Sequence, residues 1–162
     1  MSNHSEAFIR SMKNGLKFRL FLLMNLPAAF FSGLRIREMD NERCAVTVPF
    51  KWFTKNPFRS TYFACLAMAA EMSTGALAMA YLPKTTPRVS MLVTGLRANY
   101  FRKATDTVCF TCAQGLEMGA VIRKAIDTGE AQQFTAVSVG MNEQGEKMAE
   151  FYIEWGFKAK TS

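Results

Sequence analysis

The sequence predicts an α+β domain in which one long helix packs on an antiparallel sheet. Residues 62–82 form an apolar stretch rich in small side chains, and Pro83 and Pro87 stop it. Several shorter segments alternate apolar and polar residues, as half-buried strands do. Strands follow the helix without regular helical crossovers, which favours antiparallel pairing. At 162 residues, the chain is long enough for one domain with a hydrophobic core.

Each element is expected from its local pattern. A hydrophobic stretch interrupted at Pro27 predicts an N-terminal helix with a break. Two alternating segments joined by a polar turn predict a hairpin, and a loop with Asn56 and Pro57 follows them. Ser60 or Thr61 is the expected N-cap of the long helix. The expected order is helix 6–31, strands 33–40 and 43–50, helix 62–82, strands 90–103 and 107–114, helix 115–129, and strands 131–141 and 147–158.

This order divides the chain into an N-terminal helical segment, residues 1–32, and an α+β domain, residues 33–162. Residues 20–31 are apolar but too short to span a bilayer, and Asn25 and Pro27 interrupt them, so we do not expect a signal peptide. Residues 62–82 are long enough to span a bilayer as a helix, but burying the central Glu71 in lipid would cost free energy. We therefore expect a helix buried against the sheet.

Glu71 is the most informative residue. It is the only charged side chain within residues 62–82, and the only acid between Glu42 and Asp106. A glutamate is rarely buried unless a positive charge pairs with it or its carboxylate has a function. On a helical period it shares a face with small residues, among them Thr74 and Gly75. Two interpretations follow: a structural ion pair with one of the many basic residues, or a functional carboxylate.

The formal charge of +7 favours an anionic partner. No run of five basic residues occurs, and the mixture of aromatic and basic residues at 99–103 is ordinary for a strand, so we expect no nucleic acid. The four cysteines lack metal-binding spacing. Cys109 and Cys112 lie in an expected strand, where residues three apart point to opposite faces. We expect buried, reduced thiols in a cytoplasmic protein, and no metal.

Asn56 and Glu71 are fifteen residues apart. In this spacing the chain resembles the hotdog-fold acyl-CoA thioesterases of the phenylacetate type. Their signature is an Asn, a Gly three residues later, His-Gly-Gly from six residues later, and a catalytic acid fifteen residues later in the central helix. The order of elements and the strand segment at 96–103 also resemble this family, over roughly residues 33–158. The resemblance implies a hotdog fold: a sheet wrapped around a long helix, here with an extra N-terminal helix.

The signature is incomplete. Arg59 stands at the Gly position, Tyr62 at the His position, and Phe63 and Ala64 replace Gly-Gly. The chain is therefore similar to an uncharacterised branch of the family that keeps the helix acid without the His. In the family, the glycines let the thioester carbonyl reach backbone N–H groups that act as an oxyanion hole. Here the N–H of Phe63 or Ala64 would do so.

The resemblance implies thioester hydrolysis, with Glu71 as general base or nucleophile and Asn56 positioning the water or the carbonyl. Ser73 and Thr74, within one turn, are candidates to orient Glu71. The substrate would be an acyl-CoA or acyl-carrier thioester, without another cofactor. The basic residues proposed to contact the phosphates of coenzyme A are Arg97, Arg102 and Lys103, together with Lys84 and Arg88.

The resemblance also implies a homodimer, or a dimer of dimers, whose site forms between subunits. One alternative is a non-catalytic protein that binds acyl thioesters or fatty acyl groups. A second is a hydratase or dehydratase, which needs a His, but His4 is the only one. A third is membrane association through residues 13–31, where Lys13, Lys17 and Arg19 flank apolar residues. We favour the interpretation in which this segment covers the sheet or the subunit interface.

Overall fold

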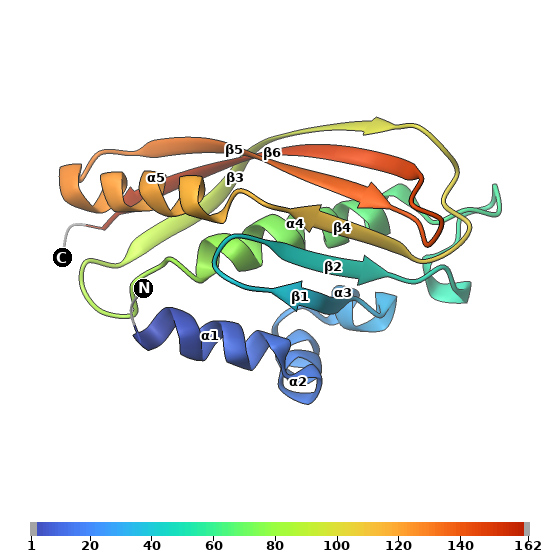
Figure 1. Cartoon of the computed structure of the whole chain (residues 1–162), viewed down its shortest axis with the longest axis horizontal. Helices are drawn as coiled ribbons and strands as arrows, with labels where there is room; N and C mark the ends of the chain where they lie inside the picture. Colours follow the sequence, from blue (N-terminus) through green and yellow to red (C-terminus); the bar gives the residue numbers. More distant parts are fainter. Residues whose placement is uncertain (1–2, 161–162) are drawn as a thin grey trace.

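The computed structural model describes residues 3–160, with side chains from residue 5. Its elements follow the expected order (Figure 1). They are α1 (Asn3–Lys13), α2 (Gly15–Asn25), α3 (Pro27–Ser32), β1 (Arg35–Met39), β2 (Cys44–Val48), the short 3-10 helix η1 (Trp52–Thr54), α4 (Phe63–Met79), β3 (Val89–Tyr100), β4 (Val108–Cys112), α5 (Gly115–Thr128), β5 (Gln132–Met141) and β6 (Lys147–Ala159).

The strands form one six-stranded antiparallel sheet in the order β1-β2-β4-β5-β6-β3. The sheet curves around α4, which contacts β2, β4, β5 and β6 (Figure 1). This arrangement confirms the predicted α+β class and the hotdog fold that the resemblance implies. The predicted hairpin is also confirmed, because β1 pairs with β2.

Small side chains allow α4 to lie close to the sheet. Ala69 and Ala70 are fully buried, and the hydroxyl of Ser73 hydrogen-bonds across the core to Ser138 of β5 at 2.8 Å. Close approach increases the number of van der Waals contacts that each small residue makes with the strands. The apolar character of residues 62–82 therefore reflects burial inside the sheet.

The expected N-cap of α4 is wrong. The helix begins at Phe63 after Tyr62, without a side-chain cap. The side chain of Ser60 bonds instead to Asn56, and the N–H of Thr61 donates to the carbonyl of Ala104 at 2.7 Å. Both residues belong to the preceding loop, and tertiary contacts of that loop replaced the local cap.

The N-terminal segment forms three helices, which corrects the single broken helix expected from the sequence. Asn14 caps α2 by accepting a hydrogen bond from the N–H of Lys17 at 3.0 Å, so the chain turns there as well as at Pro27. Gly33 ends α3 in a left-handed conformation, with φ of 80°. These helices pack against β1 and α4, on the side of α4 that the sheet leaves open.

The two edges of the sheet differ. At one edge, β1 has five residues, and α1 and α2 contact it. At the other edge, β3 has twelve residues and pairs only with β6 within residues 3–160. Its exposed side chains include Leu92 and Leu96. A long free edge of this kind is a template for pairing with another strand.

The expected opposite orientation of Cys109 and Cys112 agrees with the structure, in which Cys109 is half-buried and Cys112 is buried on β4. Cys112 instead lies opposite Cys44 of β2. Burial raises the pKa of the Cys44 thiol to about 12 and that of Cys112 to about 11. Both side chains are therefore protonated, apolar members of the core.

Candidate functional site

Glu71 lies in the middle of α4, where its side chain borders a small pocket beneath the N-terminal helices. We call this the Glu71 pocket; its volume is about 90 Å³. Apart from the carboxylate, its walls are apolar. The lining residues are Phe8, Met12, Phe21, Leu26, Glu71, Met72, Gly75, Ala76, Met79 and Met91. The N-terminal helices and β3 thus enclose the carboxylate together with α4.

The Glu71 carboxylate has no hydrogen bond or ion pair with any side chain in the described part of the chain. The ion pairs found there join Arg43 to Glu38, Arg102 to Glu146, and Lys147 to Glu150. The structural ion pair considered from the sequence is therefore not formed among the side chains of residues 5–160. Burial raises the pKa of Glu71 above its ordinary value, and no basic residue opposes that shift.

Thr74 does not orient the carboxylate. Its hydroxyl donates to the backbone carbonyl of Glu71 at 2.9 Å and accepts from Nε1 of Trp155 at 3.0 Å. Ser73 donates to the carbonyl of Ala70 and bonds to Ser138. Both hydroxyls thus tie α4 to itself and to the sheet. They fix where the Glu71 backbone lies, while the side chain remains without a partner.

Asn56 organises the loop before α4. Its Oδ1 accepts from the N–H of Phe58 at 3.0 Å and from the N–H of Ser60 at 3.2 Å. Its Nδ2 lies 3.1 Å from Ser60 Oγ and 3.4 Å from the carbonyl of Thr61. An Asn side chain bonded to the backbone two to five residues later is typical of a tight loop. Asn56 therefore holds the loop that leads into the helix.

Arg59 occupies a left-handed backbone conformation, with φ of 59°. This is the position at which the thioesterase signature has a glycine. Side chains raise the energy of this conformation, whereas glycine adopts it freely. The loop thus keeps a glycine-like backbone although the residue has changed. The Asn56 hydrogen bonds supply the contacts that hold Arg59 there.

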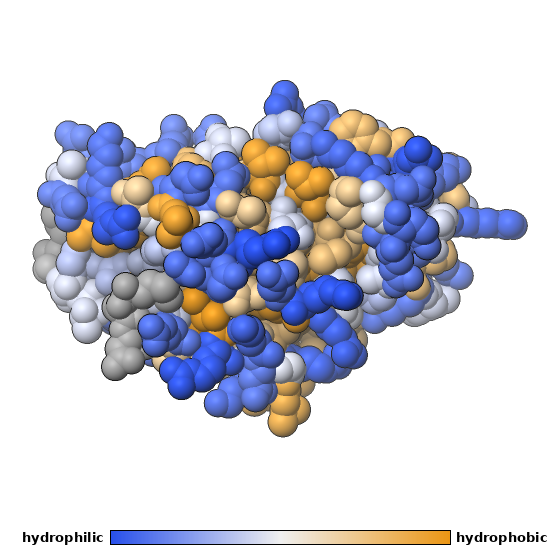
Figure 2. Space-filling model, in the orientation of Figure 1, coloured by the Kyte–Doolittle hydropathy of each residue, from blue (hydrophilic) through white to orange (hydrophobic). Residues whose placement is uncertain are grey.

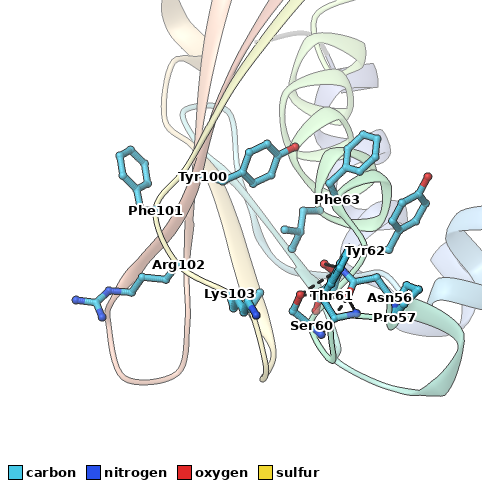
Figure 3. Close-up of a pocket in the computed structure, with 13 residues that line it drawn as sticks. Asn56, Pro57, Ser60, Thr61, Tyr62, Phe63, Tyr100, Phe101, Arg102 and Lys103 are labelled. Atoms are coloured by element: carbon cyan, nitrogen blue, oxygen red, sulfur yellow. Dashed lines mark hydrogen bonds between the residues drawn. The ribbon is translucent and has the colours of Figure 1, made fainter.

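A larger pocket lies where the N-terminus of α4 faces the end of β3 (Figure 3). We call it the α4 N-terminal pocket; its volume is about 620 Å³. Tyr100 points from β3 toward α4, with Tyr62 and Phe63 on the opposite side. The lining residues are Asn56, Pro57, Phe58, Ser60, Thr61, Tyr62, Phe63, Leu66, Tyr100, Phe101, Arg102, Lys103 and Ala104. Aromatic and polar groups therefore converge at the helix N-terminus.

The backbone N–H groups of Phe63 and Ala64 have no hydrogen-bond partner among residues 3–160. They belong to the first turn of α4, where no preceding helical carbonyl is available. The partial positive charge at this helix end adds to their ability to stabilise an oxygen anion. Phe63 borders the pocket, and its side chain is exposed.

The basic residues proposed to contact the phosphates of coenzyme A fall into two groups, those that line the α4 N-terminal pocket and those that do not. Arg102 and Lys103 line the α4 N-terminal pocket, although Arg102 points away from its centre and pairs with Glu146 at 3.5 Å (Figure 3). Arg97 does not line it, and its guanidinium stacks 4.2 Å from the ring centre of Tyr152. The structure places neither Lys84 nor Arg88 at either pocket described above.

The two halves of the candidate site are apart within one protomer. Glu71 follows Phe63 by eight helical residues, which corresponds to about 12 Å along the axis. A general base and an oxyanion donor must both lie about 3 Å from the reacting group. Asn56 and Phe63 line one pocket and Glu71 the other. One protomer therefore does not bring together the residues of the signature.

The DUF4442 family, described as a domain of unknown function, matches residues 18–156. The chain belongs to the DUF4442 family. The match includes most of α2, all of α3 and nearly the whole of the sheet, so the N-terminal helices are in part a feature of this family. No curated protein sequence is detectably similar to this chain.

Solved structures share the hotdog fold of this DUF4442 chain. A Pseudomonas aeruginosa protein of unknown function, called a probable thioesterase, is 19% identical, with a TM-score of 0.75 over 93% of this chain and 99% of that one. The Haemophilus influenzae thioesterase HI1161 is 14% identical, with a TM-score of 0.58 over 86% and 88%. The E. coli PaaI protein from the phenylacetic acid degradation operon is 13% identical, with a TM-score of 0.63 over 96% and 97%.

Sequence reasoning missed the residues that the N-terminal helices bring to Glu71. Phe8, Met12 and Phe21 line its pocket but lie 50 to 63 residues earlier in the chain. The available signal was the apolar spacing within residues 6–31, which indicated a buried face without indicating its partner. Residues 3–160 hold no cluster of three or more His, Cys, Asp or Glu side chains that could bind a metal ion.

Proposed function

We propose that this DUF4442 chain hydrolyses acyl thioesters, with Glu71 as general base or nucleophile. One observation carries the proposal: a partnerless carboxylate sits in an apolar pocket on the central helix, and burial raises its pKa. A charged group in such a place is costly, and perturbed carboxylates of this kind concentrate at functional sites. The spacing from Asn56 and the shared hotdog fold support the same chemistry.

As general base, Glu71 would take a proton from water while the water oxygen attacks the thioester carbonyl. The tetrahedral oxyanion would then collapse, break the carbon–sulfur bond and release the thiol, which takes up the proton. As nucleophile, the carboxylate would attack the carbonyl and expel the thiolate, which leaves a mixed anhydride. Water would then hydrolyse the anhydride, release the carboxylic acid, regenerate Glu71 and supply the proton that the thiolate takes up. Both routes need an oxyanion donor, and the N–H groups of Phe63 and Ala64 have that role in the proposal.

A homodimer would join the two halves of the site. The separation along α4 excludes a direct combination of Phe63 and Glu71 within one protomer. Pairing of two β3 strands along their free edges would bring a second α4 alongside the first and cover Leu92 and Leu96. Asn56 and the helix N-terminus of one protomer would then face Glu71 of its partner. Association of two such dimers is compatible with this arrangement.

The α4 N-terminal pocket is our proposed site for the thiol-bearing group of acyl-CoA or of an acyl-carrier protein. Tyr62 and Tyr100 offer aromatic surfaces, and Lys103 offers a positive charge for a phosphate. Arg102 would have to leave Glu146 to contribute. Arg97 is a weaker candidate because it stacks on Tyr152. The proposed chemistry uses no cofactor beyond the thioester itself, and the buried thiols favour a cytoplasmic location.

The size of the Glu71 pocket favours a short acyl group. Its volume of about 90 Å³ holds only a few methylene groups. Methionines such as Met72, Met79 and Met91 line it, and their flexible side chains can rearrange around different apolar groups. We therefore expect activity on short acyl-CoAs, with some tolerance for longer ones.

The test is a panel of acyl-CoAs, from short to long chain and aryl, with the wild type, Glu71→Gln and Glu71→Ala. Loss of a general base should lower kcat roughly 10²–10⁴-fold. Glu143→Gln is the matched control, because Glu143 is exposed in the turn between β5 and β6 and lines neither the Glu71 pocket nor the α4 N-terminal pocket. Full activity of the Glu71→Ala variant would refute this mechanism.

The second candidate is a non-catalytic protein that binds acyl thioesters. The absence of a side chain that orients the Glu71 carboxylate favours it. This candidate predicts binding of acyl-CoA without turnover on the same panel. It also predicts that Glu71→Gln leaves the affinity unchanged, since a neutral side chain of the same shape suits an apolar pocket.

A further inference from the structure

An apolar stripe on α2 remains exposed. Side chains of Leu16, Leu20, Leu23 and Met24 are 81%, 56%, 46% and 73% exposed. With 100° per residue, these four positions fall within an arc of about 100°. Phe18 and Leu22 occupy the opposite face and are buried. The helix therefore has an apolar face that packs on the protein and a second apolar face that does not.

Positive charge surrounds the stripe. On the helical projection, Lys17 lies on one side of it and Arg19 on the other, each about 80° from its centre. Arg19 stays beside α3, with its guanidinium 4.5 Å from the ring centre of Phe30. No acid occurs between Glu6 and Glu38. The basic residues of that interval are Arg10, Lys13, Lys17, Arg19, Arg35 and Arg37.

The stripe lies at the outside of the molecule. In Figure 1, α2 forms the lower edge, and Figure 2 shows apolar atoms protruding there between hydrophilic neighbours. The main contacts of α2 are with α1, α3 and β1, and among residues 5–160 no neighbour buries the four residues of the stripe.

We propose that the α2 stripe docks on the surface of an anionic lipid bilayer. Exposed leucine and methionine side chains would enter the boundary between headgroups and acyl chains, while Lys17 and Arg19 contact lipid phosphates. Each basic residue near an anionic surface adds attraction that salt weakens. The helix would lie in the plane of the interface, since its 11 residues extend only about 16 Å.

The basic residues beside the α2 stripe favour an anionic membrane, and not a second copy of this chain, as the surface that the stripe binds. A two-fold contact between two α2 stripes would bring Lys17 and Arg19 of both copies together without any acid from this segment. An anionic bilayer offers the complementary charge. Phe21, about 110° around α2 from the centre of the stripe, lines the Glu71 pocket, so docking would hold that pocket close to the lipid. The docking itself does not depend on thioester turnover.

The test measures sedimentation of the full chain with vesicles of phosphatidylcholine alone and with added phosphatidylglycerol. We expect binding at least about tenfold stronger to the anionic vesicles, and weaker binding at high salt. The double variant Leu20→Ser/Met24→Ser keeps every charge and should bind at least about tenfold more weakly. Lys17→Gln should weaken binding to anionic vesicles only.

Leu116→Ser is the matched control, because Leu116 is 52% exposed on α5, away from α2. It should bind as the wild type does. Equal binding of the double variant and the wild type would refute the proposal, as would failure of the wild type to bind anionic vesicles. A lower oligomeric mass of the double variant in solution, measured by sedimentation equilibrium, would also refute it, since the stripe would then be an interface between copies. Circular dichroism checks that each variant is folded.

Discussion

The Oε1 atom of Glu71 lies against Gly75, one helical turn later. A Cβ atom at Gly75 would approach Glu71 Oε1 to 3.2 Å and Cζ2 of Trp155 to the same distance. The missing side chain leaves room for the carboxylate and the indole on the same side of α4. This close approach explains why a small residue is needed here, in the middle of an otherwise regular helix.

Substitution of Gly75 by Ala should therefore reduce activity more than stability. The new Cβ would displace the Glu71 carboxylate by a few tenths of an ångström, while alanine improves helix propensity by about 1 kcal/mol. We expect a roughly tenfold or larger loss of kcat, because misplacement of a reacting group is costly, with little change in the free energy of unfolding. Gly15→Ala, in open space at the start of α2, is the control and should leave kcat unchanged. Unchanged kcat in Gly75→Ala would argue against a reacting role for this carboxylate.

The N–H of Phe63 can be removed without breaking α4. Proline is tolerated at the first helical position, and Tyr62, with φ of −62° and ψ of 133°, already has the conformation that a following proline requires. Phe63→Pro should lower kcat roughly 10²-fold by removing one oxyanion donor. Phe63→Ala also removes the ring but keeps the N–H, so it should retain most of the activity. Equal kcat for the two variants would exclude this N–H from the mechanism.

Mixing two inactive variants tests whether the site is shared between protomers. In a mixed dimer of Glu71→Gln and Phe63→Pro, one site would contain both native groups. With random exchange, half of the dimers are mixed, so the activity should recover to about a quarter of the wild-type value. A site made within one protomer would give no recovery, because every protomer carries one defect. Activity measured before and after subunit exchange distinguishes these outcomes.

Glu71→Gln should be more stable than the wild type at neutral pH. Burial raises the folded-state pKa of Glu71 above its ordinary value of 4.5, so the folded chain holds the proton more tightly than the unfolded chain does. The wild type is therefore penalised above the folded-state pKa, and the penalty disappears as the pH falls toward 4.5. The Tm of the variant should therefore exceed that of the wild type at neutral pH, and this difference should shrink as the pH falls toward 4.5. A difference that stays constant with pH would contradict it, and Glu143→Gln supplies the comparison for an exposed carboxylate.

Arg59→Gly should stabilise the loop before α4. Glycine adopts the φ of 59° without the side-chain penalty, although it also makes the unfolded chain more flexible. The net gain should be about 0.5–1 kcal/mol, which is a rise in Tm of roughly 1–4 °C for a chain of this size. Lys55→Gly is the control, because Lys55 has a φ of −77°, where glycine relieves no backbone strain. A lower Tm for Arg59→Gly would mean that contacts of the arginine side chain outweigh the backbone strain.

The sequence alone determined the class and order of elements. Apolar and polar residues alternate along the strands, and residues 62–82 concentrate small side chains, so local periodicity was sufficient to predict a helix inside an antiparallel sheet. The isolation of Glu71 among apolar residues was also visible, because a charge in such a stretch is costly wherever the chain folds. Its spacing from Asn56 indicated the family resemblance and hence the fold.

Only the tertiary structure decided what surrounds these residues. It placed Phe8 and Phe21 over Glu71 and left the carboxylate without an ion pair, because contacts between distant segments depend on packing and not on local spacing. The Thr74 hydroxyl accepts a hydrogen bond from Trp155 and does not contact the Glu71 carboxylate. The Ser60 side chain bonds to Asn56 and does not cap the helix. The tertiary structure also showed that the N-terminus of α4 and Glu71 border different pockets, which the place of both residues in one expected helix did not reveal.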